Sequence, residues 1–148
     1  MKILVFSDSH GLRNAMAETA KKEFPDLILH LGDRASDCEG LFSCRVVAVR
    51  GNCDSFSDEE ETRFLDFGVT KIFMTHGHRF GVKTTLSRLL AEGEKACATL
   101  VLYGHTHVPY LSVSASCSVM NPGTPDRSYG VLELAADGTL TDIRLIEK

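Results

Sequence analysis

The sequence predicts an α/β domain in which two β-sheets pack face to face with helices on the outside. Short apolar runs of strand length recur along the whole 148-residue chain, whereas helical patterns separate them only in places. Strands that alternate with helices pair in parallel through right-handed crossovers. Two sheets that bury one face against each other and cover their outer faces with helices would bury all of these runs.

The first part of the chain alternates strands and helices. Apolar runs of strand length, each ending at a polar turn, lie at residues 2–6, 27–31 and 46–49. A stripe with one apolar residue every four positions is formed by Leu12, Met16, Ala20 and Phe24. This stripe predicts a helix over residues 11–24, ended by Pro25 and Asp26. Residues 36–42 are expected to form one or two further helical turns.

Strands predominate in the rest of the chain. Further strands are predicted at residues 62–67, 71–75, 99–103, 111–113, 117–120, 129–134 and 140–146. One amphipathic helix is predicted among them, with an apolar side made by Val82, Leu86, Leu89 and Leu90. Turn signals at residues 121–123 and 137–138 connect the last strands, which predicts a C-terminal β-meander. The edge of this meander leaves homo-oligomerisation open.

Length and composition predict one domain over residues 1–148, with a hydrophobic share of 43% and a charged share of 24%. No stretch approaches the roughly 20 apolar residues of a membrane span. Asp8 comes too early for a signal peptide, so a cytoplasmic location is expected. The formal charge of −4 argues against a membrane-surface or long nucleic-acid partner. Five cysteines without a C-x-x-C pair predict reduced thiols.

Seven side chains that can ligate a metal directly follow apolar runs: Asp8, His10, Asp33, Asn52, His76, His105 and His107. On an extended segment, positions i and i+2 point to the same side, so Asp8 and His10 are expected to face one ion. The carboxyl ends of parallel strands meet at one edge of a sheet. Seven donors exceed the needs of one ion and suit two ions, about 3.5–4 Å apart, that share a carboxylate.

The donor types also restrict the metal. Mixed imidazole and carboxylate ligands favour manganese, iron, zinc or nickel over magnesium or calcium. Taken singly, each position has a structural explanation, because Gly-Asp and Gly-Asn form turns and a lone histidine is often a hydrogen-bonded structural residue. Taken together, five of the six histidines follow apolar runs, and only His30 lies within one. The joint pattern therefore predicts a metal centre.

The order of these motifs resembles the calcineurin-like metallophosphoesterase superfamily, and more narrowly its small YfcE-like phosphodiesterase branch. The matching motifs are Asp8-x-His10, Gly32-Asp33, Gly51-Asn52-Cys53-Asp54, His76-Gly77-His78, Gly104-His105-Thr106-His107 and Asn121-Pro122-Gly123. The resemblance implies a four-layer α-β-β-α sandwich with two divalent ions, for which manganese is favoured and nickel, iron or zinc are alternatives. It implies a small phosphodiester substrate, whose phosphorus is attacked by a hydroxide that bridges the ions.

The resemblance also implies individual roles. One ion would be held by Asp8, His10 and His107, and the other by Asn52, His76 and His105. Asp33 would bridge the two ions. Catalytic roles are expected for Asp33 and Asn52, and for His78 as a helper, although a solvated His78 explains the sequence equally well.

Cys53 occupies a position where many superfamily members carry a histidine that protonates the leaving oxygen. A thiol is a poor acid in that role, which predicts a preference for diesters or aryl esters over unactivated monoesters. A small buried packing residue is the alternative interpretation of Cys53. The alternative function is a non-catalytic interaction scaffold of the same fold, like a retromer subunit. Because all seven donors are present, an enzyme is expected.

Overall fold

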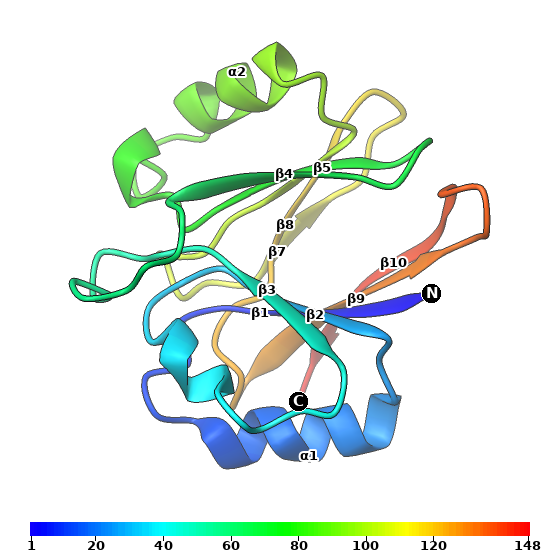
Figure 1. The fold of residues 1–148 in the computed structure, drawn as a ribbon. Coiled ribbons are helices and arrows are strands. Elements are labelled where there is room, and N and C mark those ends of the chain that lie inside the picture. Colours follow the sequence, from blue (N-terminus) through cyan, green and yellow to red (C-terminus); the bar gives the residue numbers. More distant parts are fainter.

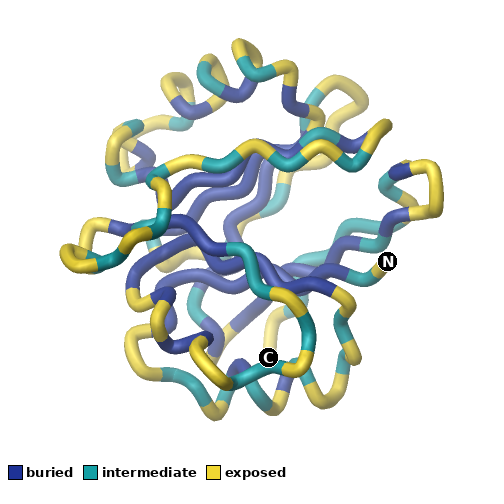
Figure 2. The backbone as a smooth tube through the Cα atoms, in the orientation of Figure 1, coloured by how far each residue is buried: buried dark blue, intermediate teal, exposed yellow.

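A computed structural model describes residues 1–148 and shows two five-stranded sheets packed face to face. One helix covers the outer face of each sheet, as Figure 1 shows with α1 and α2 on opposite sides of the molecule. The central strands of both sheets are buried, whereas the helices expose their outer sides (Figure 2). The predicted α/β sandwich with helices outside is confirmed.

The first sheet has the strand order β10-β9-β1-β2-β3. Its strands are β1 (Lys2–Phe6), β2 (Leu27–His30), β3 (Arg45–Ala48), β9 (Ser128–Leu134) and β10 (Leu140–Glu147). The strands β1, β2 and β3 are parallel, with Val5 opposite Leu29, and β9 pairs antiparallel with β1. The three parallel strands therefore end on the same side of the sheet.

The second sheet has the strand order β4-β5-β6-β8-β7. Its strands are β4 (Thr62–Asp66), β5 (Lys71–Thr75), β6 (Leu100–Leu102), β7 (Tyr110–Ser112) and β8 (Ser118–Asn121). The central strands β5, β6 and β8 are parallel, and the edge strands β4 and β7 run antiparallel to their neighbours. Both sheets are thus mixed, with a parallel centre that aligns strand ends.

The helices are shorter than the sequence pattern predicts. They are α1 (Arg13–Glu23), α2 (Ser87–Lys95) and the 3₁₀ turns η1 (Ala35–Cys38) and η2 (His78–Phe80). Phe24 ends α1 in a left-handed conformation. Val82, which the pattern placed on the second helix, lies before α2 but still packs in the same apolar cluster as Leu89. The periodicity of the sequence therefore correctly indicated that Val82 packs beside Leu89, but it wrongly placed Val82 on the helix.

The prediction of one C-terminal β-meander is wrong. The strand β8 lies in the second sheet, parallel to β6, whereas β9 crosses to the first sheet and pairs with β1. The C-terminal strands instead form two separate hairpins, β7–β8 in the second sheet and β9–β10 in the first. The apolar pattern marks which segments are strands, but the free edge of β1 decides where β9 pairs.

Both faces of the central strands are buried, which explains their continuous apolar runs. In β1, Ile3 and Val5 belong to the cluster between the sheets, together with side chains of β5 and β6. The alternate residues Leu4 and Phe6 pack against Met16 of α1. In the second sheet, Val101 packs against Leu89 of α2.

Neither α1 nor α2 has the length and the apolar composition of a membrane-spanning helix.

The end of α1 is joined to the first sheet by a partly buried hydrogen-bond network. The hydroxyl of Tyr129 on β9 donates to Glu23 at 2.8 Å, and the ammonium group of Lys2 on β1 donates to the other carboxylate oxygen at 3.0 Å. Burial opposes ionisation of Glu23, but these two donors lower its pKa overall. The network favours the charged carboxylate.

We expect Glu23→Gln to lower the free energy of unfolding at pH 7 by about 1 kcal/mol, because the charged hydrogen bonds are lost. A native pKa below the unfolded value stabilises the fold above the ordinary value of 4.5, and this contribution disappears as the pH falls through the native pKa. The difference between the two proteins in urea unfolding should therefore shrink from pH 7 to pH 3. Glu18→Gln, an exposed change on the same helix, is the control. A difference that stays constant with pH would contradict the assignment.

Candidate metal centre

The predicted donors come together at one end of the sandwich, and both sheets contribute. Asp8 and Asp33 follow β1 and β2 of the first sheet, whereas His76 and His105 follow β5 and β6 of the second. Backbone hydrogen bonds align neighbouring strand ends, from Asp8 N–H to the Gly32 carbonyl and from Gly104 N–H to the His76 carbonyl, both at 2.9 Å. Side chains up to 99 positions apart in the sequence therefore face one space.

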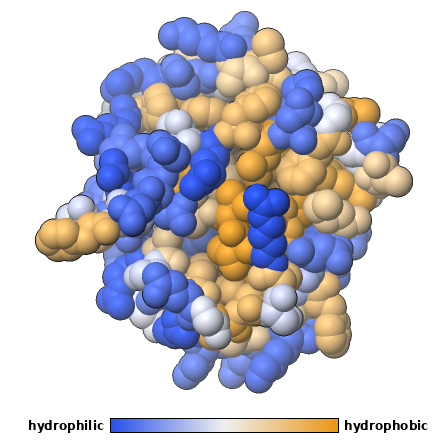
Figure 3. Space-filling view, viewed as in Figure 1, coloured by the Kyte–Doolittle hydropathy of each residue, from blue (hydrophilic) through white to orange (hydrophobic).

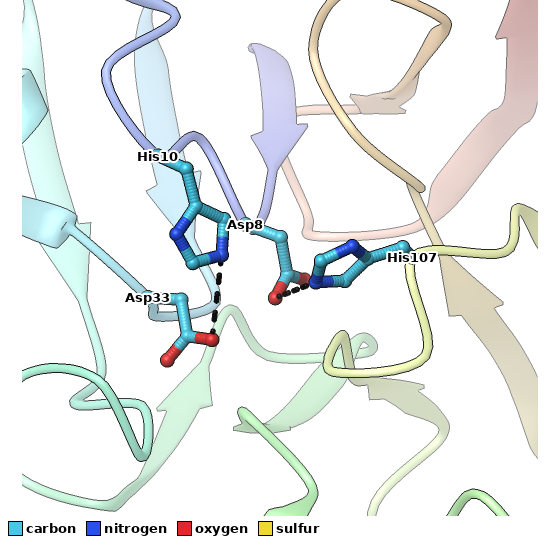
Figure 4. Close-up of side chains that lie close together, drawn as sticks. All are labelled: Asp8, His10, Asp33 and His107. Atoms are coloured by element: carbon cyan, nitrogen blue, oxygen red, sulfur yellow. Dashed lines mark ion pairs between the residues drawn. The ribbon is translucent and has the colours of Figure 1, made fainter.

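The donors form two groups that share one carboxylate. The first group is Asp8, His10, Asp33 and His107, and the second is Asp33, His76 and His105. Within each group the donor atoms lie within 4.8 Å of one another. Figure 4 shows the first group, with His10 directed at Asp33 and His107 directed at Asp8. Asp33 alone belongs to both groups.

Asp8 presents one carboxylate oxygen to this space. Its Oδ2 accepts hydrogen bonds from the Ser7 hydroxyl at 2.6 Å and from the His105 N–H at 3.0 Å. Its Oδ1 is buried, accepts no hydrogen bond and lies 3.2 Å from Nε2 of His107. A buried anionic oxygen without a partner is costly. A bound cation would satisfy it.

His76 is fully buried and its orientation is set by the backbone. Its Nδ1 lies 2.8 Å from the carbonyl oxygen of Leu31, which only an N–H can satisfy. Nε2 therefore faces the cluster, 3.4 Å from Oδ2 of Asp33 and 3.2 Å from Nδ1 of His105. A carbonyl that holds one ring nitrogen so that the other can bind metal is the usual arrangement for a histidine ligand.

The shared carboxylate is held by the turn after β3. The N–H of Cys53 donates to Oδ1 of Asp33 at 2.9 Å, while Asp54 accepts the N–H groups of Asp33, Arg34 and Gly51 at 2.6–2.9 Å. Burial opposes ionisation of Asp33, but the nearby His76 ring and the hydrogen bond from the Cys53 N–H hold its pKa well below the ordinary value. Asp33 is therefore an anion at neutral pH.

The local conformation of the donors differs from the prediction. Asp8 and His10 are not on an extended segment, because their φ angles are +54° and +39°. Eight non-glycine residues have positive φ, and five of them are predicted donors. The donors with this conformation are Asp8, His10, Asp33, His105 and His107. Left-handed turns at the strand ends, rather than strand alternation, direct these side chains into one space.

Two glycines allow the turns to approach the carboxylates closely. A Cβ atom at Gly51 would collide with Oδ1 of Asp33, and one at Gly104 would lie 2.8 Å from Oδ2 of Asp8. Real Cβ atoms are not found at such distances. The Gly-Asn and Gly-His pairs of the sequence therefore have a steric role in addition to forming turns.

A buried hydrogen-bond chain, which sequence reasoning missed, supports the turn that carries Asp8 and His10. Ser9 lies between these two donors, 2.9 Å from Nε2 of His30, and its hydroxyl donates to Asp37 at 2.8 Å. The Gly32 N–H donates to Nδ1 of His30 at 3.1 Å, so Nε2 carries the proton and donates to Ser9. Burial lowers the pKa of His30 to about 4, which keeps it neutral.

The sequence contained one signal that pointed to this hydrogen-bond network. His30 is the one histidine inside an apolar strand, and a buried polar residue needs a partner. The sequence could not identify the partner of His30, because Ser9 lies 21 positions away from it. Asp37 in turn lies 28 positions away from Ser9.

Asn52 and His78 lie beside the two groups without joining their hydrogen bonds. Asn52 is exposed on the turn after β3, and its amide contacts Sγ of Cys53 at 3.5 Å. His78 begins η2, with its ring centre 5.5 Å from that of His76 and 6.2 Å from that of His105. Its buried Nδ1 has no hydrogen-bond partner. Cys53 is exposed, so the packing interpretation of this residue is not supported.

The site fits two divalent cations. Two buried carboxylates lie among several imidazoles, one oxygen of Asp8 lacks a partner, and Asp33 reaches both donor groups. Such a concentration of anionic oxygens and oriented ring nitrogens matches the ligands of divalent metal ions.

Comparison with known proteins identifies the family. The sequence model of the calcineurin-like phosphoesterase superfamily domain matches residues 1–136. The chain belongs to the calcineurin-like phosphoesterase superfamily.

Curated relatives of this calcineurin-like domain include bacterial proteins. The chain is 32% identical over 146 residues to the probable metallophosphoesterase YsnB of Bacillus subtilis, covering 93% of this chain and 86% of YsnB. It is also 32% identical over 143 residues to the phosphodiesterase YfcE of Escherichia coli, covering 84% of this chain and 67% of YfcE.

Solved structures share the calcineurin-like fold. A Vps29 variant from Entamoeba histolytica aligns with a TM-score of 0.79 at 18% identity, covering 100% of this chain and 99% of that one. YfcE, described as a phosphoesterase from E. coli, aligns with a TM-score of 0.66 at 24% identity over 97% and 98% of the two chains. At these identities the structural likeness concerns the fold alone.

We expect Ser9→Ala to lower the free energy of unfolding by about 1–3 kcal/mol, because it leaves the buried His30 and Asp37 groups without their shared partner. Urea unfolding at pH 7 measures this loss, and the exposed change Ser43→Ala is the matched control. If both variants unfold within about 0.5 kcal/mol of the unmodified protein, the hydrogen-bond chain has no structural importance.

Proposed function

We propose that this protein is a phosphodiesterase that depends on two divalent metal ions. The main support is the pair of donor groups that share Asp33, built on a fold whose family is established. Relatives named metallophosphoesterase and phosphodiesterase agree with this proposal. The proposed substrate is a small phosphodiester.

The proposed ligands follow the two groups. Asp8, His10 and His107 would hold one ion, Asn52, His76 and His105 would hold the other, and Asp33 would contribute to both. Manganese is the favoured metal, with nickel, iron or zinc as alternatives. When bound, a pair of such ions supplies an activated water and neutralises phosphate oxygens.

The residues of the chain contribute position and charge. Asp33 is kept anionic by the Cys53 N–H, and the Leu31 carbonyl keeps Nε2 of His76 directed at the cluster. Asn52, exposed at the rim, can donate its amide to a phosphate oxygen. His78, whose ring centre lies 5.5 Å from that of His76, is the candidate to assist the leaving oxygen.

A diester with a good leaving group is favoured over a monoester. Although Cys53 is exposed, partial desolvation of its sulfur and the nearby Asp33 carboxylate raise the pKa of the thiol, so it is a weak proton donor at neutral pH. An aryl oxygen leaves without full protonation, whereas an alkyl oxygen of a monoester depends more on an acid. The net charge of −4 disfavours long nucleic acids.

The competing function is a non-catalytic interaction scaffold of the same fold. The arrangement of the donors favours the enzyme, because a protein-binding surface has no need for a buried carboxylate oxygen without a partner. Turnover separates the two functions directly.

Protein stripped with a chelator should be inactive toward bis(p-nitrophenyl) phosphate, and added Mn²⁺ should restore release of p-nitrophenol, because the nucleophile requires the ions. Calorimetric titration of the stripped protein should give two Mn²⁺ per chain. Binding of Mn²⁺ without any hydrolysis of the diester would favour the scaffold.

We expect Asp33→Asn to lower kcat by roughly a hundredfold or more, because the shared ligand loses its charge. The fold should survive, since the amide oxygen can still accept the Cys53 N–H, and circular dichroism checks this. Asp137→Asn, a change on an exposed turn between β9 and β10, is the control. Undiminished turnover with two ions bound would refute the role of Asp33.

A further inference from the structure

Two cavities flank the candidate metal centre on different sides. The larger, about 710 Å³, begins at Arg34 and Cys53, next to Asp33. The smaller, about 320 Å³, is lined by Asp8 and His107 of the centre itself. Asp33 and His107 point in from opposite sides of the first donor group (Figure 4). Both cavities are within the size range of small-ligand pockets, roughly 300–1,000 Å³.

The larger cavity has a mixed lining of apolar and polar side chains, with acidic residues at its rim. Its apolar residues are Ala35, Cys38, Val46, Ala48 and Phe56. The loop between β3 and β4 projects from the molecule in Figure 1, and its tip is apolar in Figure 3. Phe56 on this loop is fully exposed, with a relative accessibility of 101%, so its ring is free to stack on a ligand.

The charges around the larger cavity exclude an anionic ligand group. Arg34, its one basic residue, lies 3.5 Å from the carboxylate of Asp37, which compensates its charge. Glu39 and Asp58 at the rim form no ion pair. An uncharged aromatic group therefore suits this cavity better than a second phosphate.

The smaller cavity is polar and carries both hydrogen-bond donors and acceptors. Thr124, Asp126 and Arg127 line it opposite the metal-ligand candidates. The N–H of Arg127 donates to the Thr124 carbonyl at 2.9 Å, which closes this turn, while the exposed guanidinium group forms no ion pair. A guanidinium donor, a carboxylate acceptor and a hydroxyl together match an alcohol that carries further hydroxyl groups.

We propose that the two cavities receive the two ester arms of one substrate, a small phosphodiester that joins an aromatic alcohol to a short polyhydroxy alcohol. The inference rests on the proposed phosphodiesterase function and specifies its substrate class. A phosphomonoester would occupy only one cavity. Phe56 and Arg127 are then specificity-determining residues for the aromatic and the hydroxylated arm, respectively.

The hydroxylated arm is tested with two diesters that release the same p-nitrophenol. The Mn²⁺-loaded protein should hydrolyse glyceryl p-nitrophenyl phosphate with a kcat/KM about tenfold above that of propyl p-nitrophenyl phosphate, the effect of one to two good hydrogen bonds. Arg127→Ala should abolish this preference while retaining turnover of the propyl ester. Arg45→Ala, at the opposite end of β3, should leave the preference unchanged.

The aromatic arm is tested by binding, independently of turnover. The chain has no tryptophan, so Phe56→Trp introduces a single fluorophore. Its emission should be quenched by 4-nitrobenzylphosphonate, whose C–P bond is not hydrolysed, and not by methylphosphonate. Phe56→Ala should raise the dissociation constant of 4-nitrobenzylphosphonate, measured by calorimetric titration, about three- to tenfold, whereas Phe24→Ala, an exposed change at the far end of the domain, should not.

The outcomes separate this inference from the proposed function. No hydrolysis of either diester by the Mn²⁺-loaded protein overturns the phosphodiesterase function and the inference with it. Hydrolysis of both diesters at equal kcat/KM, or the absence of quenching at Trp in place of Phe56, overturns the assignment of the corresponding cavity and leaves the phosphodiesterase function intact.

Discussion

The buried carboxylate of Asp33 is the constraint on which the site depends, because it is the one side chain shared by both donor groups. It extends from the first sheet toward His76 of the second sheet. A shared carboxylate requires that the ends of β2 and β5 lie at one height across the sandwich. The apolar packing between the sheets sets that height, so the core and the site are parts of one arrangement.

This arrangement carries a conformational cost. Five donors are in left-handed backbone conformations, which cost roughly 1–2 kcal/mol per non-glycine residue. Hydrogen bonds offset the cost where the turns are buried. Asp54 accepts three N–H groups around Asp33, and the Ser9–His30–Asp37 chain holds the turn between Asp8 and His10. Residues that bind no metal therefore maintain the geometry of those that are proposed to do so.

The charges of the site are also arranged in a way that suits a bound cation. Asp8 and Asp33 place two carboxylates close together in a largely buried space, and one oxygen of Asp8 has no partner. Like charges in low dielectric repel and favour the protonated form, unless a cation is present. The protein instead places the Cys53 N–H and the His76 ring beside Asp33, which keeps it charged. The repulsion between these buried carboxylates lowers the local stability of the fold, and it keeps the proposed ligands anionic.

The sequence by itself determined the strands and the layered fold and singled out the candidate donors, because apolar runs and the polar turns that end them are local patterns. Six of the seven predicted donors fall into two compact groups, and Asn52 lies beside them. Only the tertiary structure decided how the donors are grouped, that β9 leaves the C-terminal strands to pair with β1, and that His30 supports the Ser9 turn. These features arise from contacts between distant segments and from backbone conformations that no residue type specifies alone.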